Sequence, residues 1–271
     1  MLDELRQAVN ARVVRAFEGE QLDLLLEPEA LQEAERLAQA ISEGAGGTAE
    51  HSSARLVLGS FLWGRHLALG SPGFSPDRDA AISWLAPYVA AGGDPDAVPA
   101  PLLDEVVNAA ARTASDLVPE SVDSHPPEVV DSAITTLRHV VAACPEAHPN
   151  LAAMLTNLGT ALKFRSERTS SVPDVDEAIA FLRRAVEVTP ADHAMRAGRL
   201  FNLAIAISHR FNLTHADEDL DDSLKGFTDT LDAMAPDDPE RPAVHEYLGS
   251  VFRARAARRS PSFGQAAFVE R

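Results

Sequence analysis

Apolar residues in the C-terminal half of the chain recur at helical spacing, and their pattern repeats at a fixed offset of 45 residues. The recurring positions are Leu155, Leu158 and Leu162 in one copy, Leu200, Leu203 and Ile207 in the next, and His245, Leu248 and Phe252 in a third, partial copy. Apolar residues three to four positions apart predict an amphipathic helix. A fixed period of this length, built from helices, is typical of an α-solenoid.

A small residue follows the second large one in each first helix, at Gly159, Ala204 or Gly249. We expect this small residue to let a neighbouring helix approach closely. The second helix of the unit combines small and large side chains and then ends at a proline, which a helix interior does not tolerate. The residues of this second pattern are Ala178, Leu182, Ala185 and Pro190.

Acidic residues mark the expected start of each second helix. Asp174 with Glu177 has the spacing of a capping box, and Asp219 with Asp222 repeats it 45 residues later. Carboxylates also suit the positive end of a helix. We therefore predict that Asp174 and Asp219 are N-caps.

The order leucine-glycine, alanine, leucine, alanine and proline in this unit, from Leu158 to Pro190, resembles the tetratricopeptide repeat. The unit is longer than the common repeat of about 34 residues, because its loops are longer. It is similar to the tetratricopeptide arrays of high-GC bacteria that often precede CHAT-type protease domains. The resemblance covers roughly residues 125–258 and implies a right-handed α-solenoid of stacked antiparallel helix pairs, whose first helices line a concave groove.

Helical spacing extends into the N-terminal part, where the repeat is weaker. The helices expected there and in the following unit cover residues 1–17, 28–41, 49–69, a segment around Ala81 and Leu85, 102–117 and 129–143. We predict an all-α chain of about five helix pairs, diverged over residues 1–124 and regular over 125–271, forming one continuous solenoid. Residues 240–259 are expected to form the first helix of an incomplete unit, and residues 260–271 its second helix or a cap.

Charge and composition restrict the partners. The chain of 271 residues has a formal net charge of −17, which disfavours phosphate backbones, so we expect no nucleic-acid partner. No apolar run reaches the ~18 residues of a membrane span, and we expect no membrane association, no signal peptide and a cytoplasmic location. Cys144 is the single cysteine, so it has no partner for an intramolecular disulfide.

The resemblance places the first helices along a groove that binds a partner protein or peptide. In some related arrays an asparagine just before the leucine-glycine pair hydrogen-bonds the backbone of a bound peptide, and an amide offers the donor and acceptor this requires. The residues predicted to line this groove are Asn157, Thr160, Lys163, Phe164, Asn202, Ile205, His209 and Tyr247, with Ser208 beside them. The alternative is that the two asparagines bond to loops of adjacent repeats and bind no ligand.

Arginines also keep the repeat register, at Arg165, Arg210 and Arg255. We expect them to bind carbonyls at helix ends and acidic loop residues, and the alternative is a basic stripe for a ligand. The last helix adds Arg253, Arg258 and Arg259. Its arginines form either a solvated cap or a docking patch.

Motifs for catalysis and metal binding are missing from the sequence. The acidic run that ends at Asp222 resembles a calcium loop, but Asp222 stands where glycine must turn the chain and Thr228 where a bidentate glutamate is needed. There is no HExxH, no cysteine-histidine cluster and no GxSxG. We therefore expect no enzyme, no metal and no cofactor.

The function that the sequence favours is a scaffold or adaptor that binds a partner peptide or protein in the groove. The main alternative is a regulatory or sensor module that acts on a separately encoded effector. A third alternative is a helical enzyme with a site between repeats. A homodimer formed through the C-terminal end is also left open.

Overall fold

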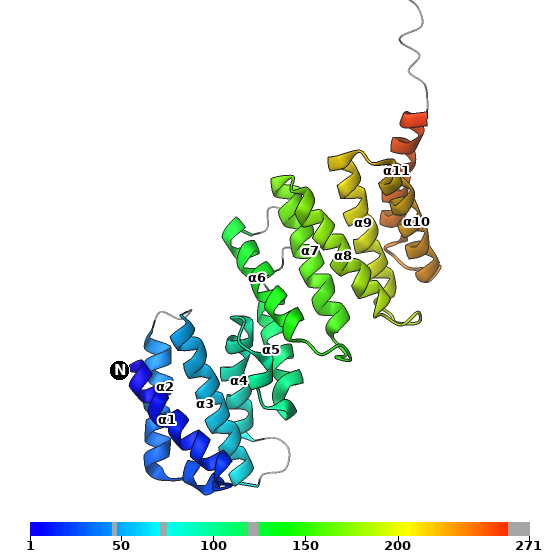
Figure 1. The fold of residues 1–271 in the computed structure, drawn as a ribbon. Coiled ribbons are helices and arrows are strands. Elements are labelled where there is room, and N and C mark those ends of the chain that lie inside the picture. Colours follow the sequence, from blue (N-terminus) through cyan, green and yellow to red (C-terminus); the bar gives the residue numbers. More distant parts are fainter. Residues whose placement is uncertain (45–47, 71–74, 117, 119–124, 260–271) are drawn as a thin grey trace, which may run out of the picture. The chain divides into compact units, whose positions relative to one another are not determined.

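The computed structural model of this chain describes residues 1–44, 48–70, 75–116, 118 and 125–259. Within these residues every regular element is a helix, and consecutive helices pack on one another, as predicted for an all-α solenoid of helix pairs (Figure 1). The α-helices are α1 (Leu2–Glu18), α2 (Pro28–Glu43), α3 (Ala49–Ala68), α4 (Pro76–Ala90), α5 (Leu103–Ser115), α6 (Pro127–Ala143), α7 (Leu151–Thr169), α8 (Val172–Glu187), α9 (Arg196–Thr214), α10 (Asp217–Ala233) and α11 (Arg241–Arg259). The described residues also contain the 3-10 helices η1 (Leu22–Leu25), η2 (Pro95–Ala97) and η3 (Ala100–Leu102).

These helices fall into two compact units. Unit 1 comprises Met1–Leu117 and Asp131–Met154, and unit 2 comprises Val118–Val130 and Leu155–Arg271. Helices α6 and α7 therefore each contribute residues to both units. The boundary that we expected after residue 124 stays a prediction.

The core of unit 1 is formed by the apolar faces of its helices. Helix α1 buries Val9, Val13 and Ala16, which lie three or four residues apart along one face. Pro28 occupies the first turn of α2, where a missing amide hydrogen costs nothing. Ser75 caps α4 by accepting a hydrogen bond from the backbone amide of Arg78.

The 45-residue period recurs in unit 2 as a turn before α9 and again before α11. Nδ1 of His193 accepts a hydrogen bond from the amide of Met195 at 3.0 Å. Forty-five residues later, Oδ1 of Asp238 accepts from the amide of Glu240 at 2.9 Å. Different side chains thus hold the same turn.

Two further arginines repeat a contact between neighbouring helices. The Arg196 guanidinium, at the start of α9, donates to the carbonyl of Val186 at 3.1 Å. Arg241, at the start of α11, donates to the carbonyl of Leu231 at 2.7 Å. The period read from the sequence is therefore also a period of tertiary hydrogen bonds.

The predicted N-caps were wrong. Ser171 caps α8 through its hydroxyl, and Asp174 is the third residue of that helix. Helix α10 has Ala216 at the N-cap position, and Asp219 is again the third residue. Both carboxylates are instead directed to arginines of the preceding helix.

Three arginines at the same position of successive first helices each form an ion pair with an aspartate of a second helix. We call this set, Arg165, Arg210 and Arg255, the arginine ladder. Arg165 binds Asp174 at 2.7 Å, so the first rung joins α7 to α8. We expected these arginines to bind carbonyls at helix ends and acidic loop residues. The ion pairs of the structure are instead formed with aspartates within the second helices. The hydrogen bonds of Asp219 are the main cause that raises the pKa of Arg210 above its ordinary value.

The expected close approach at small residues is present in both units. A Cβ atom added to Gly159 would lie 2.6 Å from Cγ of Leu182, and one added to Gly59 would lie 2.5 Å from Cγ of Leu85. Glycine leaves a notch in the first helix, and a leucine of the second helix fills it.

Among the described residues, no helix is both long and apolar enough to span a membrane. The second helix or cap that we predicted for residues 260–271 lies outside the described residues.

Candidate functional site

A pocket of about 460 Å³ lies in unit 2 between the first helices α7, α9 and α11. It is lined by Thr160, Lys163, Phe164 and Glu167 of α7, by Asn202, Ile205, Ser208, His209 and Asn212 of α9, and by Tyr247 of α11. The structure therefore gathers the residues predicted for the groove around one cavity, except Asn157. We call this cavity the first-helix pocket.

Asn157 is half-buried on α7 and does not line the first-helix pocket. It lies one turn closer to the start of α7 than Thr160. Sequence reasoning missed two lining residues, Glu167 and Asn212. Each lies one turn beyond a predicted residue on the same face of its helix, so the spacing of three to four residues could have found both.

Lys163 carries the only ammonium group in the lining, and its charge is already neutralised. Its Nζ lies 2.9 Å from a carboxylate oxygen of Glu167 and 3.7 Å from the ring centroid of Phe164. The Lys163 side chain is 12% exposed. An ion pair and a cation–π contact hold this ammonium in place, so the pocket offers little net charge to a ligand.

A hydrogen-bonded chain joins the two helices that form most of the pocket. The Ser166 hydroxyl lies 2.7 Å from the carbonyl of Ser171 and 3.0 Å from Nε2 of His209. Because the single hydroxyl proton goes to the carbonyl, Nε2 of His209 is the donor to Ser166. In the neutral imidazole, Nδ1 is then an acceptor.

Burial is the main cause that lowers the pKa of His209 below its ordinary value. The carboxylate of Glu167 opposes this shift, and the ammonium of Lys163 adds to it. Burial disfavours the charged imidazolium. His209 therefore enters the pocket as a neutral group at neutral pH.

The remaining wall is aromatic. The ring of Tyr247 lies 5.4 Å from that of Phe201, edge to face, and 5.8 Å from that of Phe227, stacked. Tyr247 nonetheless stays 43% exposed. Two ring contacts hold the tyrosine in position while leaving one side of it accessible to a ligand.

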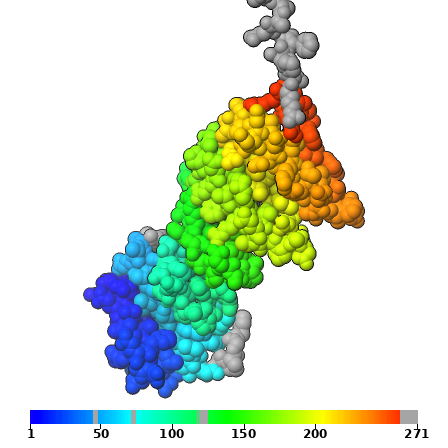
Figure 2. All heavy atoms as spheres, turned by 45° about the vertical axis from the view of Figure 1, so that its right-hand side comes forward, coloured from blue at the N-terminus to red at the C-terminus, as the bar shows by residue number. Residues whose placement is uncertain are grey.

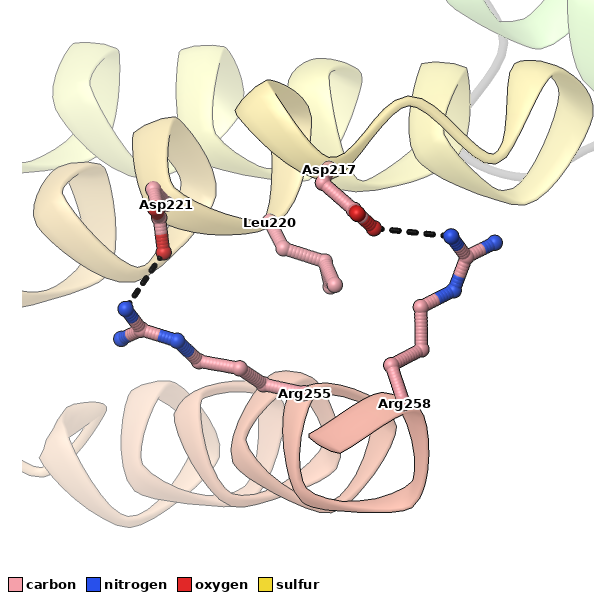
Figure 3. A pocket seen from close by; sticks show the side chains of 5 residues that line it. All are labelled: Asp217, Leu220, Asp221, Arg255 and Arg258. Atoms are coloured by element: carbon pink, nitrogen blue, oxygen red, sulfur yellow. Dashed lines mark hydrogen bonds and ion pairs between the residues drawn. The ribbon is translucent and has the colours of Figure 1, made fainter. Parts of the chain in front are cut away.

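Two aspartates of the acidic run at the start of α10 form ion pairs with arginines of α11. Asp217 binds Arg258 and Asp221 binds Arg255, each at 2.8 Å, and the two pairs flank Leu220 around a small cavity of about 150 Å³ (Figure 3). Within the described residues, no group of three or more histidine, cysteine or carboxylate side chains is placed to hold a metal ion. The run thus fastens α11 to α10.

A second, more apolar cavity of about 520 Å³ lies at the loop end of α9, α10 and α11. Met195, Phe201, Met234 and Val244 contribute its apolar wall. Its polar side chains are Thr230, Asp238 and Glu240, and none of the residues that the sequence predicted for the groove lines it. We therefore take the first-helix pocket as the candidate functional site.

Comparison of the chain with models of known protein families, and with curated protein sequences, gives no match.

Proposed function

We propose that the chain is a protein-interaction scaffold that binds an extended segment of a partner protein in the first-helix pocket. The observation that carries this proposal is the convergence of the predicted groove residues, from three first helices, on one cavity. Alternating amide, hydroxyl and aromatic groups suit a peptide backbone with apolar side chains. The tetratricopeptide resemblance and a cytoplasmic location belong to the same proposal.

The chemistry of the lining indicates a ligand of low charge. The charge of Lys163 is balanced by Glu167, and His209 is neutral at neutral pH. Asn202 and Asn212 can each donate to and accept from a peptide group. Tyr247, fixed by its ring contacts, provides a stacking surface that needs little reordering when a ligand docks.

Selection from a random peptide library tests the proposal. The intact chain should enrich peptides with a shared sequence, and Asn202→Ala and Tyr247→Ala should each weaken their affinity by about tenfold, measured by fluorescence anisotropy. Arg183→Ala, at an exposed position on α8, is the matched control and should bind as the wild type does. Equal affinities for the wild type and both pocket variants would contradict the proposal.

Small-angle scattering of the same complexes separates the scaffold from the sensor alternative. A preformed pocket predicts an unchanged radius of gyration when the selected peptide binds. A ligand-dependent change would favour a sensor whose shape reports the partner.

A further inference from the structure

Helix α11 carries a row of residues that is more exposed than the equivalent row in the preceding copies of the repeat, with Gly249 half-buried and the other three residues exposed. We call this row the end face: His245, Gly249, Phe252 and Ala256, which share one side of α11 at helical spacing. In the first copy the equivalent residues are Leu155, Gly159, Leu162 and Ser166, and all four are buried. In the second copy Ala204, Ile207 and Phe211 are buried and Leu200 is half-buried.

Phe252 shows the difference most clearly. The equivalent Leu162 is fully buried and Ile207 nearly so, whereas Phe252 is 53% exposed. A Cβ atom at Gly159 would collide with Leu182, but one at Gly249 would meet only a guanidinium nitrogen of Arg253, at 3.5 Å. The notch that a second helix fills in the earlier copy is therefore open among the described residues.

The space-filling view places α11, in red, at the margin of unit 2, beside the orange surface of α10 (Figure 2). Helix α10 is also its packing neighbour in the described residues (Figure 1). The end face lies on a different side of α11 from Tyr247, which lines the first-helix pocket. The two surfaces can therefore be occupied and tested separately.

The arginine ladder indicates the charge of the occupant. Arg210 has two carboxylate partners, Asp176 of the preceding second helix and Asp219 of its own. Arg255 binds Asp221, which lies 45 residues after Asp176 and is its equivalent. The equivalent of Asp219 would be residue 264, where the sequence has a glycine instead of an aspartate.

The second helices of the repeat share a sequence pattern, and this pattern indicates which kind of helix could pack on the end face. Asp174, Ala178 and Leu182 follow one another at intervals of four residues, as do Asp219, Ser223 and Phe227. The carboxylate binds the arginine, the small residue allows close approach, and in α8 the large residue fills the notch. The chain's own residues at this register, Gly264 and Phe268, have neither the carboxylate nor the small side chain.

We propose that the end face docks an amphipathic helix of a partner protein that has an aspartate in its first turn, a small residue four positions later and a leucine or phenylalanine four positions after that. The aspartate binds Arg255, and the large residue enters the notch at Gly249. Symmetric docking of two α11 helices is disfavoured, because it would bring Arg253 and Arg255 of both chains together. The partner helix continues the helical stacking of unit 2.

A synthetic peptide with the sequence of residues 171–188, which contains α8, serves as the probe in fluorescence anisotropy with the full chain. We expect saturable binding that Phe252→Asp weakens by at least about tenfold, because the variant removes the apolar contact. Gly249→Leu, which places a large side chain in the notch, should weaken binding similarly, because a Cβ at Gly249 makes only an ordinary contact with Arg253 among the described residues. The peptide variant Asp174→Asn should bind about tenfold more weakly, and Arg255→Gln should abolish that difference.

Controls assign the binding to this face. Asn202→Ala, in the first-helix pocket, should leave the affinity for the probe unchanged. The proposal is overturned if the full chain does not bind the probe, or if Phe252→Asp and Gly249→Leu bind it as the wild type does. Binding seen only after Phe268→Asp would assign the face to the chain's own C-terminal residues, and a dimer that Phe252→Asp dissociates would assign it to a second copy. Either result overturns docking of a partner helix.

Discussion

The helix pair α3–α4 of unit 1 and the pair α7–α8, whose contact lies in unit 2, use the same apolar contact but different ion pairs. In both, a glycine of the first helix receives a leucine of the second, Gly59 with Leu85 and Gly159 with Leu182. The loop of the first pair is longer, yet the notch is filled in the same way. Apolar packing therefore tolerates a change in loop length.

The ion pairs are more sensitive to the way the second helix begins. Asp77 is the second residue of α4, and Arg65 approaches it only to 3.4 Å. Asp174 and Asp219 are third residues of their helices, and Asp174 lies 2.7 Å from Arg165. One position in the first turn rotates a side chain by about 100°, so it changes the geometry of the pair.

Removing the carboxylates should reveal the largest difference between these ion pairs, in the free energy of unfolding that each variant loses. Asp219 is 4% exposed and bound to Arg210, so Asp219→Ala should lower the free energy of unfolding by about 3 kcal/mol, as for a broken buried pair. Asp77→Ala should cost about 1 kcal/mol, as for a weaker pair. Urea denaturation of both variants, followed by circular dichroism, measures this. Equal losses would show that the first-turn position is irrelevant.

A second test compares a filled notch with the open one. Gly159→Ala should destabilise the chain by about 2 kcal/mol, because the added Cβ overlaps Leu182. Among the described residues, a Cβ at Gly249 would make only an ordinary contact with the Arg253 guanidinium, so Gly249→Ala should stabilise α11 by about 0.5–1 kcal/mol through helix propensity. Thermal unfolding of the two variants should shift in opposite directions. A loss of stability in Gly249→Ala would mean that the end face is covered in solution.

Arg199 permits a smaller test between copies of the repeat. Its register is occupied by Met154 in the preceding copy and Val244 in the next, both buried. Arg199 is 9% exposed and donates to the hydroxyl of Thr189, and burial lowers the pKa of its guanidinium. Arg199→Met should therefore raise the free energy of unfolding by about 1 kcal/mol in urea denaturation. Arg183→Met, at an exposed site, should change it by less than about 0.5 kcal/mol. A net loss in Arg199→Met would assign the arginine a stabilising role.

The smallest effect concerns pH. Since burial holds the pKa of His209 below its unfolded value of about 6.5, the unfolded chain takes up a proton first as the pH falls. The contribution of His209 to stability is therefore complete above about pH 6.5 and decreases below it. Melting temperatures at pH 5 and pH 7.5 should differ more for the wild type than for His209→Gln, which cannot titrate. Identical differences would place the pH dependence at titratable groups other than His209.

The helices and the pocket residues were predictable for the same physical reason. A helical face repeats every three to four residues, so apolar spacing located the helices, and residues such as Thr160, Lys163 and Asn202 share the face that borders the pocket. Glu167 and Asn212 follow from the same rule. That Asn157 lies outside the pocket could not be predicted, because spacing along a helix does not say where a cavity ends.

The caps and the end face were beyond local sequence rules. Both Ser171 and Asp174 carry oxygen atoms able to cap α8, and only the position of Arg165 on another helix decides that the carboxylate serves the ion pair. The exposure of Phe252 depends likewise on what lies beside α11, which the sequence of that helix does not contain. Contacts between helices therefore set the limit of the prediction.

Arg210 has a consequence for how the array opens. Its guanidinium holds carboxylates from α8 and α10 at once while its own backbone belongs to α9, so three consecutive helices share one charge (Figure 1). When α10 detaches, the guanidinium loses its less exposed partner and α9 loses its packing against α10, so only the exposed pair with Asp176 still ties Arg210 to α8. In hydrogen exchange, the amides of α8, α9 and α10 should therefore become accessible as one cooperative block, larger than the two-helix repeat that the sequence defines.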